Sequence, residues 1–185
     1  MGIAIRPNVV MRAMTLADVP LLDAWDREPH VIAATTDDPD DPKAFGDLYW
    51  PDELSRVAPD YQYFMAELDG RPIGAMLMID PATEASHYWG AIEPNLRALD
   101  IWIGAAQDLG KGYGTAMMRR AFQMCFADPV VEAIVIDPLA SNLRAHRFYQ
   151  RLGFVAEGVR VFDEDDACLV HRLTRARWRA MFPGD

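Results

Sequence analysis

A glycine-rich segment between an apolar run and an amphipathic stretch constrains this 185-residue chain more than any other feature. It reads Gln-Asp-Leu-Gly-Lys-Gly-Tyr-Gly-Thr over residues 107–115 and follows the apolar run 99–103, which predicts a strand. Apolar residues then recur at three- and four-residue spacing from Met117 to Cys125, which predicts a helix. Glycines let the backbone approach a ligand closely, and a helix N-terminus carries partial positive charge. The segment therefore predicts a site for a phosphate or pyrophosphate group.

The spacing of the glycines excludes two common phosphate-binding patterns. The P-loop is absent because no Gly-Lys pair precedes Ser or Thr, and the third glycine is misplaced for the dinucleotide pattern G-x-G-x-x-G. The pattern Q-x-x-G-x-G does fit, at Gln107, Gly110 and Gly112. It resembles motif A of the GCN5-related N-acetyltransferases (GNAT), which holds the pyrophosphate of acetyl-coenzyme A. A glycine-rich turn without a ligand is the alternative.

A second motif strengthens the resemblance, since residues 141–154 are similar to the N-x-x-A-x-x-x-Y-x-x-x-G-F signature of the same family. Ser141 or Asn142 suits a helix N-cap and Gly153 the position after a helix end, so a helix of about ten residues is predicted. In the family the asparagine contacts the pantetheine arm, and the tyrosine, here Tyr149, lies beside the thioester sulfur. Taken alone, Tyr149 would be interpreted as a core residue. The resemblance implies coenzyme contacts from Ile101, Trp102, Ile103, Gln107, Leu109, Gly110, Lys111, Gly112, Tyr113, Gly114, Thr115, Asn142, Arg147 and Tyr149.

The length of the chain suits a single domain, expected over residues 1–185, in which strands first meander and then alternate with helices. This order indicates an α/β fold with a mixed, mostly antiparallel central sheet flanked by helices. The resemblance implies that this sheet is splayed around the acetyl-coenzyme A site. Besides the helix after the glycines, the expected strands are 3–6, 9–13, 61–68, 72–79, 87–92, 97–104, 133–137, 154–160 and 167–173, and the expected helices are 15–25, 43–57, 142–152 and 175–181.

The net charge of −10 is unevenly distributed along the chain. Residues 1–100 hold 18 acidic and 7 basic side chains, whereas residues 111–151 hold 3 acidic and 6 basic ones. The basic segment is the one with both motifs, which suits a polyanion such as coenzyme A. A pI near 4.8 disfavours nucleic acid as a partner.

Composition also disfavours several other classes of protein. The longest apolar runs have the length of strands, so no membrane association is expected. Cys125 and Cys168 lie in apolar surroundings and are expected to be buried thiols, which fits the cytoplasm. The four histidines lack metal-ligand spacing, so no metal is expected. The expected assembly is a monomer or a homodimer.

Asp100 is the candidate for catalysis because it interrupts the apolar strand Leu99–Ile103. Acetyl transfer to an amine needs a polarised thioester carbonyl, an acceptor for the amine proton and a proton for the departing thiolate. Backbone N–H groups of this strand would polarise the carbonyl, Asp100 would accept the amine proton, and Tyr149 would protonate the thiolate. The alternative is that Asp100 faces solvent on the polar side of an edge strand.

A closer resemblance covers residues 95–160, where Asp100, the glycine-rich segment and Asp137-Pro138 are similar to aminoglycoside 6′-N-acetyltransferases. In that group an aspartate at the Asp100 position acts as base and one at the Asp137 position binds substrate amines. The resemblance implies acetyl transfer to a primary amine of a polycationic small molecule such as an aminoglycoside. Acidic residues of the first hundred would help to gather the cation: Asp37, Asp38, Asp40, Asp41 and, as a substrate contact, Glu93.

Two alternative functions remain open at this point. Siderophore acetyltransferases share similar segments but typically place histidine where Asp100 stands, and their acceptor is a lysine-type or hydroxylamine nitrogen. A protein of another class, a sensor that binds acetyl-coenzyme A without turnover, would also keep both motifs. The cluster His87-Tyr88-Trp89 would line the acceptor cleft in either enzyme, although aromatic clusters on strands more often serve packing.

Overall fold

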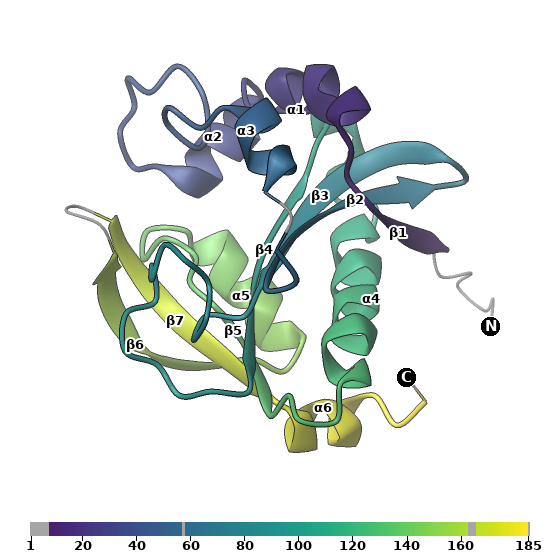
Figure 1. Ribbon diagram of the computed structural model, residues 1–185, viewed down its shortest axis with the longest axis vertical. Coiled ribbons are helices and arrows are strands. Elements are labelled where there is room, and N and C mark those ends of the chain that lie inside the picture. Colours follow the sequence, from purple (N-terminus) through teal and green to yellow (C-terminus); the bar gives the residue numbers. More distant parts are fainter. Residues whose placement is uncertain (1–7, 57, 163–165, 185) are drawn as a thin grey trace.

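The computed structural model describes residues 8–56, 58–162 and 166–184. Its centre is a seven-stranded sheet with the strand order β1-β2-β3-β4-β5-β7-β6 (Figure 1). The strands are β1 (Val9–Ala13), β2 (Tyr61–Leu68), β3 (Arg71–Ile79), β4 (Leu96–Ile103), β5 (Ala133–Ile136), β6 (Val155–Phe162) and β7 (Asp166–Thr174). The helices are α1 (Val19–Trp25), α2 (Pro29–Thr35), α3 (Trp50–Ser55), α4 (Tyr113–Ala127), α5 (Leu143–Arg151) and α6 (Arg175–Met181), with short 3-10 turns at Leu16–Asp18 and Ala106–Asp108.

The sheet opens between its two central strands. β4 and β5 are the one parallel pair among the described strands, and they pair only from Leu96 opposite Ala133 to Ala98 opposite Val135. Beyond these residues β4 continues along β3, whereas β5 ends at Ile136. The strands therefore form two arms, β1–β4 and β5–β7, that diverge (Figure 1). The expected mixed, mostly antiparallel and splayed sheet is confirmed.

Helices cover the two faces of the sheet separately. The buried face of α4 presents Met118 and Phe122 to the cluster that includes Leu99 and Ile134 of the central strands. The helices α1–α3 gather at one end of the β1–β4 arm (Figure 1), where Trp50 packs in a cluster with Trp102 of β4. Because residues alternate in direction along a strand, Leu99 and Trp102 point to opposite faces. The functional segment of β4 is thus packed from both sides.

Several local predictions are confirmed. The turn between β2 and β3 contains Asp69 and Gly70 with φ of 51° and 76°, the geometry that an Asp-Gly hairpin favours. The α6 helix spans Arg175–Met181, the range expected from the sequence. Cys125 and Cys168 are buried thiols rather than a disulfide pair.

Other predictions are wrong or fall outside the described residues. The segment 87–92 forms turns instead of a strand, with positive φ at His87 and Gly90. The buried carboxylate of Glu84 organises these turns by accepting hydrogen bonds from the Ser86 and Tyr88 N–H groups at 2.7 and 2.9 Å. The expected helix 43–57 shrinks to α3, and α2 was not expected. The proposed strand 3–6 lies outside the described residues.

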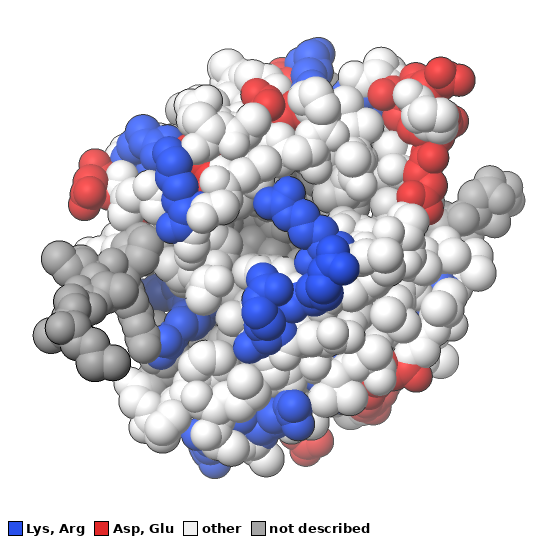
Figure 2. Space-filling model, turned by 180° about the vertical axis from the view of Figure 1, so that it is seen from behind, with Lys and Arg blue, Asp and Glu red and all other residues white. Residues whose placement is uncertain are grey.

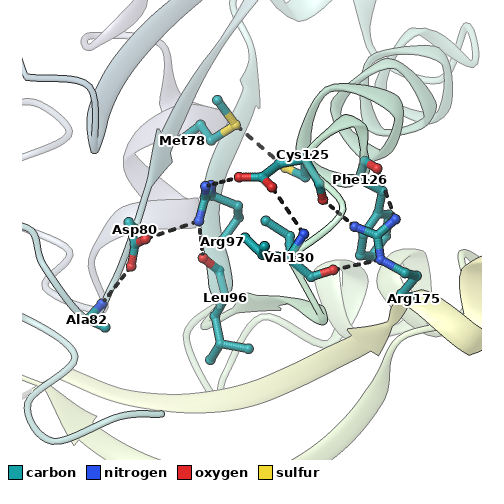
Figure 3. A network of polar contacts seen from close by, with 11 residues as sticks. Met78, Asp80, Ala82, Leu96, Arg97, Cys125, Phe126, Val130 and Arg175 are labelled. Atoms are coloured by element: carbon teal, nitrogen blue, oxygen red, sulfur yellow. Dashed lines mark hydrogen bonds and ion pairs between the residues drawn. The ribbon is translucent and has the colours of Figure 1, made fainter. Parts of the chain in front are cut away.

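A polar cluster closes the end of the sheet opposite the opening (Figure 3). Arg97 of β4 pairs with Asp80 at 3.1 Å and with Asp128, which follows α4, at 3.4 Å. Arg175 at the start of α6 donates to the carbonyls of Phe126 and Val131 at 2.9 and 2.7 Å, and also to that of Asp128. These contacts satisfy carbonyls at and beyond the C-terminus of α4.

We expect Arg175→Ala to lower the free energy of unfolding by roughly 2–4 kcal/mol, because several backbone carbonyls lose a charged donor. Urea denaturation measures this loss. Arg179 lies on the same helix with an exposed side chain, and Arg179→Ala should stay within about 0.5 kcal/mol of the wild type. Equal stability of the two variants would contradict the capping role of Arg175.

Candidate active site

A cleft of about 860 Å³ occupies the opening between the two arms. One wall is the β4 segment from Leu99 to Ile103, and the other runs from Ile136 to Leu139 at the end of β5. The glycine-rich loop and α5 close one side, and residues 30–35 of α2 lie across the other. The cleft is therefore built by the divergence of two strands that begin as a parallel pair.

The β4 wall offers backbone donors to the cleft. The Gly104 N–H donates to the Ile73 carbonyl on the β3 side at 3.0 Å. Because N–H groups alternate in direction along a strand, those of Ile101 and Ile103 point the other way, where β5 has diverged. His30 of α2 reaches the same wall, with its Nε2 atom 2.9 Å from the Ile103 carbonyl oxygen. The wall can thus hold an extended, amide-containing ligand by main-chain hydrogen bonds.

The glycine-rich loop has the geometry expected of an anion site. Gly110 and Gly112 adopt φ of 74° and 81°, and no heavy atom beyond the adjacent residues lies within 4 Å of a Cβ built on either glycine. α4 starts at the next residue, Tyr113, so the unpaired N–H groups of its first turn face the loop. Open space above glycines at a helix N-terminus suits a pyrophosphate.

Basic side chains surround the hollow on the face of the molecule that Figure 2 shows, the reverse of the view in Figure 1. Three arginines of α5, Arg144, Arg147 and Arg151, line the cleft. Lys111 instead lies 3.5 Å from the buried Asp108, which also pairs with Arg71 at 2.7 Å. Asp108 is thereby neutralised, and the cleft keeps a positive rim that favours a polyanion.

The second motif forms α5, and of the two candidate caps, Ser141 and Asn142, it is Asn142 that caps the helix. The Asn142 Oδ1 atom accepts a hydrogen bond from the Ala145 N–H at 3.0 Å, which leaves the Asn142 side-chain amide N–H groups for a ligand. Tyr149 is 8% exposed and packs against Phe148 and Phe154. Burial, reinforced by the charges of Asp100 and Asp137, raises the pKa of Tyr149. Its hydroxyl therefore keeps its proton at neutral pH and can donate it.

Asp100 and Asp137 face each other across the opening, one from each arm. Both line the main cleft and also a second pocket of about 190 Å³, so they mark the junction of the two. Burial and then the charge of Asp137 raise the pKa of Asp100. Burial likewise raises the pKa of Asp137, against a hydrogen bond of 2.8 Å from the Tyr88 hydroxyl. The carboxylate of Asp100 is open to the cleft yet closely surrounded, and it can take up a proton near neutral pH.

The second pocket has an aromatic wall. Its lining includes Tyr61, Tyr88 and Trp89 together with the two aspartates. Aromatic faces and carboxylates attract an organic cation, whose charge both can stabilise. The arrangement thus presents a cation-binding pocket to one side of the carboxylates and an anion-binding cleft to the other.

The structure brings together most of the residues singled out in the sequence, with some exceptions. Glu93 lies outside both pockets and pairs with Arg172 at 2.7 Å. Gln107 and Lys111 do not line the cleft, although their neighbours Leu109 and Gly110 do. The other expected coenzyme contacts line it: Ile101, Trp102, Ile103, Gly112, Tyr113, Gly114, Thr115, Asn142, Arg147 and Tyr149.

Sequence reasoning missed a part of the site that comes from α2. His30, Val31, Ala33, Ala34 and Thr35 of this helix line the cleft. Asp37, expected among the acids that gather the cation, lines neither pocket; it follows the helix and accepts a hydrogen bond of 2.6 Å from the Ser141 hydroxyl on the other arm. Pro29 at the helix start was the available signal, since proline favours the first turn of a helix.

Two further observations concern the described residues alone. Their His, Cys, Asp and Glu side chains form no group of three or more that could hold a metal ion. No helix among them is long and apolar enough to cross a membrane.

Comparison with known proteins agrees with this geometry. The family described as "Acetyltransferase (GNAT) domain" matches residues 15–162. Aminoglycoside N(6′)-acetyltransferase type 1 of Klebsiella pneumoniae is 31% identical over 156 residues, which cover 82% of this chain and 76% of that protein. A kanamycin resistance protein of Rhizobium radiobacter is 40% identical over 76 residues, 40% of this chain and 70% of that protein.

Solved structures give the same result. The crystal structure of aminoglycoside acetyltransferase AAC(6′)-Ib in complex with coenzyme A and kanamycin superimposes with a TM-score of 0.78 and 27% identity, over 94% of this chain and 98% of that chain. A spermidine N-acetyltransferase from Vibrio cholerae shares the fold, with a TM-score of 0.69 and 18% identity over 92% of this chain and 97% of that chain. The chain therefore belongs to the GNAT family of acetyl-coenzyme A-dependent N-acetyltransferases.

Proposed function

We propose that this enzyme transfers the acetyl group of acetyl-coenzyme A to the 6′-amine of an aminoglycoside. The observation that carries the proposal is the pair Asp100 and Asp137, set where the coenzyme cleft meets a pocket with an aromatic wall. Two neighbouring carboxylates that share an opening are suited to a substrate with more than one ammonium group. The relatives named for aminoglycoside and kanamycin support the same substrate class.

The coenzyme would extend along the whole cleft. Its pyrophosphate would bind the N–H groups of residues 109–115, with Arg147 close to its charge. The pantetheine arm would follow β4 and use the N–H groups of Ile101 and Ile103 and the side-chain amide of Asn142. This path ends at Tyr149 and Asp100, where the thioester would lie.

The acetyl transfer would then need only Asp100, Asp137, Tyr149 and a backbone N–H group of β4. The amine nitrogen attacks the thioester carbonyl carbon, and its proton passes to the Asp100 carboxylate. A backbone N–H of β4 stabilises the charge that develops on the carbonyl oxygen. The carbon–sulfur bond breaks, and the Tyr149 hydroxyl protonates the departing thiolate. Asp137 would hold a second ammonium group of the acceptor and so orient the first.

The partner is thus a small-molecule amine rather than a nucleic acid, because the chain is acidic overall and the three arginines that line its cleft suit the coenzyme. We also infer a cytoplasmic location, where acetyl-coenzyme A is made. The chain would act as a monomer or a homodimer.

Tyr149→Phe should lower kcat by about tenfold to a thousandfold, since it keeps the ring but removes the proton for the thiolate. Steady-state kinetics at saturating acetyl-coenzyme A measure this change. As a control, Phe148→Tyr adds a hydroxyl at the neighbouring cleft residue. Combined with Tyr149→Phe in a double variant, it should not restore the rate. A Tyr149→Phe enzyme with a kcat within about twofold of the wild type would show that Tyr149 serves packing alone.

The acid limb of kcat/KM should move to lower pH in Asp137→Asn. Asp100 must be deprotonated to act, so activity falls as the pH drops through its raised pKa. Removing the charge of Asp137 removes one cause of that rise, so Asp100 should ionise at a lower pH. A limb that stays in place, or moves to higher pH, would contradict the coupling of the two carboxylates.

A panel of acceptors tests the proposed function. Release of free coenzyme A is followed with a thiol reagent for kanamycin, a lysine-type amine and a hydroxylamine-containing siderophore. We expect release in proportion to added kanamycin. Release with the lysine-type amine or the siderophore alone would favour siderophore-type acetylation. Tight acetyl-coenzyme A binding without release for any amine would favour a sensor.

A further inference from the structure

Two buried histidines lie behind Tyr149, and the chemistry proposed above does not use them. His146 of α5 and His171 of β7 are 6% and 0% exposed. Their rings stack with centroids 5.2 Å apart and an angle of 20° between the planes. The His171 ring also packs against the ring of Tyr149, at 6.3 Å between centroids. Buried titratable groups of this kind are seldom placed in a core without a specific role.

The hydrogen bonds define the protonation of both rings. His146 Nε2 lies 3.1 Å from the Ala140 carbonyl oxygen, and His171 Nδ1 lies 2.7 Å from that of Leu169. A carbonyl can only accept, so these two nitrogens carry the protons. The other nitrogens, His146 Nδ1 and His171 Nε2, are buried without a hydrogen-bond partner in the described structure. A second proton on either ring would be a buried, unpaired charge, so each imidazole is neutral and donates once. Burial lowers the pKa of His171, in agreement.

His171 lies at the strand end that carries Asp137. In the pairing of β5 with β7 it stands opposite Ile136, the residue directly before Asp137. Leu169, whose carbonyl accepts from His171, donates its own N–H to the Pro138 carbonyl at 2.9 Å. The His171 ring thus fixes the conformation of β7 at the point where the chain leaves β5 and enters the site.

His146 makes the matching contact from the helix. Its side chain reaches back from α5 to Ala140, the end of the segment that begins with Asp137. Tyr149 follows His146 by three residues on the same helix, so both project from neighbouring positions of one face. The stacked rings therefore join the helix that carries Tyr149 to the strand and turn that carry Asp137.

We propose that His146 and His171 are positioning residues for acetyl transfer, which as a neutral stacked pair hold the Tyr149 hydroxyl in place relative to Asp137 and the thioester. The inference rests on the proposed role of Tyr149 as proton donor. It explains why two polar rings, each with one unsatisfied nitrogen, occupy a position that aliphatic side chains would fill without this cost.

Variants at His146 test the role of its single donor. His146→Leu keeps an apolar side chain but leaves the Ala140 carbonyl without its donor. His146→Gln restores an N–H at the distance of Nε2. We expect kcat to fall about tenfold in His146→Leu, as a small displacement of a catalytic group would cause, and to recover to within about threefold of the wild type in His146→Gln. Coenzyme affinity should change less than twofold, because the phosphate loop precedes α4 and the coenzyme contacts of α5, Asn142 and Arg147, are not substituted.

A double-mutant cycle with Tyr149→Phe separates positioning from general stability. It is measured as kcat with any amine that the wild type accepts, so it does not depend on the acceptor being an aminoglycoside. If the pair acts through Tyr149, His146→Leu should lower kcat less than twofold in the Tyr149→Phe background. If His146→Leu does not fold, His146→Asn, whose amide is too short to reach Ala140, takes its place.

Two outcomes would overturn the inference. One is a folded His146→Leu enzyme with the kcat of the wild type. The other is an additive cycle, in which His146→Leu costs the same factor with and without the tyrosine hydroxyl. Failure of the proposed chemistry would look different. An unchanged kcat in the single Tyr149→Phe variant would show that Tyr149 is not the proton donor, whichever result the His146 variants give.

Discussion

Replacing Asp100 with asparagine should lower turnover of an aminoglycoside by two or more orders of magnitude, a loss of roughly 3 kcal/mol in transition-state stabilisation. Asparagine keeps the size and polarity of the side chain but cannot accept the proton of the attacking amine. The effect should be large because Asp100 stands at the junction of the two pockets. Steady-state rates with kanamycin measure it.

The controls for this variant separate chemistry from binding and folding. The dissociation constant for acetyl-coenzyme A should stay within about threefold, because the phosphate loop is a different segment of the cleft. Asp23→Asn removes one carboxylate from an exposed position on α1 and should leave turnover unchanged. A rate for Asp100→Asn within about threefold of the wild type would contradict the assignment of the base.

Gly112→Asp should weaken the binding of acetyl-coenzyme A by about a hundredfold or more. The substitution places a side chain and a negative charge in the open space above the loop, where the pyrophosphate must approach. Gly112 also has a φ of 81°, so any side chain adds backbone strain there. Isothermal titration with acetyl-coenzyme A measures the affinity, and circular dichroism shows that the variant is folded.

Two matched variants divide this effect into its parts. Gly112→Ala adds the same strain without charge. We expect the factor by which it weakens coenzyme binding to be less than one tenth of the factor for Gly112→Asp. Gly70→Asp adds the same residue at another glycine of positive φ with open space around it, in the turn between β2 and β3, and should bind the coenzyme as the wild type does. A folded Gly112→Asp protein with unchanged affinity would overturn the loop assignment.

Much of the fold was predictable because its signals are local. The hairpin turn at Asp69-Gly70, the helix after the glycines and α6 each follow from residues within a few positions. The prediction of a strand at 87–92 was wrong because of Glu84, a buried carboxylate three residues earlier. It accepts hydrogen bonds from backbone N–H groups that a strand would have paired with a neighbouring strand. That contact leaves no mark in the hydrophobic pattern.

The site shows the same division. Asp100, Asp137 and Tyr149 were found by motif, and the structure places all three on one cleft. Glu93 was expected in the site only because of its negative charge, and in the structure that carboxylate pairs with Arg172 outside the cleft. The contribution of α2 depends on the long-range contacts of His30 and Asp37 with the two arms. Such contacts arise from tertiary packing, which the spacing of residues does not encode.

The position of the acetyl group on the product tests the central proposal most directly. The enzyme is incubated with acetyl-coenzyme A and kanamycin, and the product is examined by mass spectrometry and nuclear magnetic resonance. We expect one acetyl group, on the 6′-nitrogen, with one free coenzyme A released for each product formed. An analogue with a hydroxyl in place of the 6′-amine should give no amide at that position and little coenzyme A release. Acetylation of the analogue as fast as that of kanamycin, or acetylation of kanamycin at another nitrogen, would contradict the proposed function.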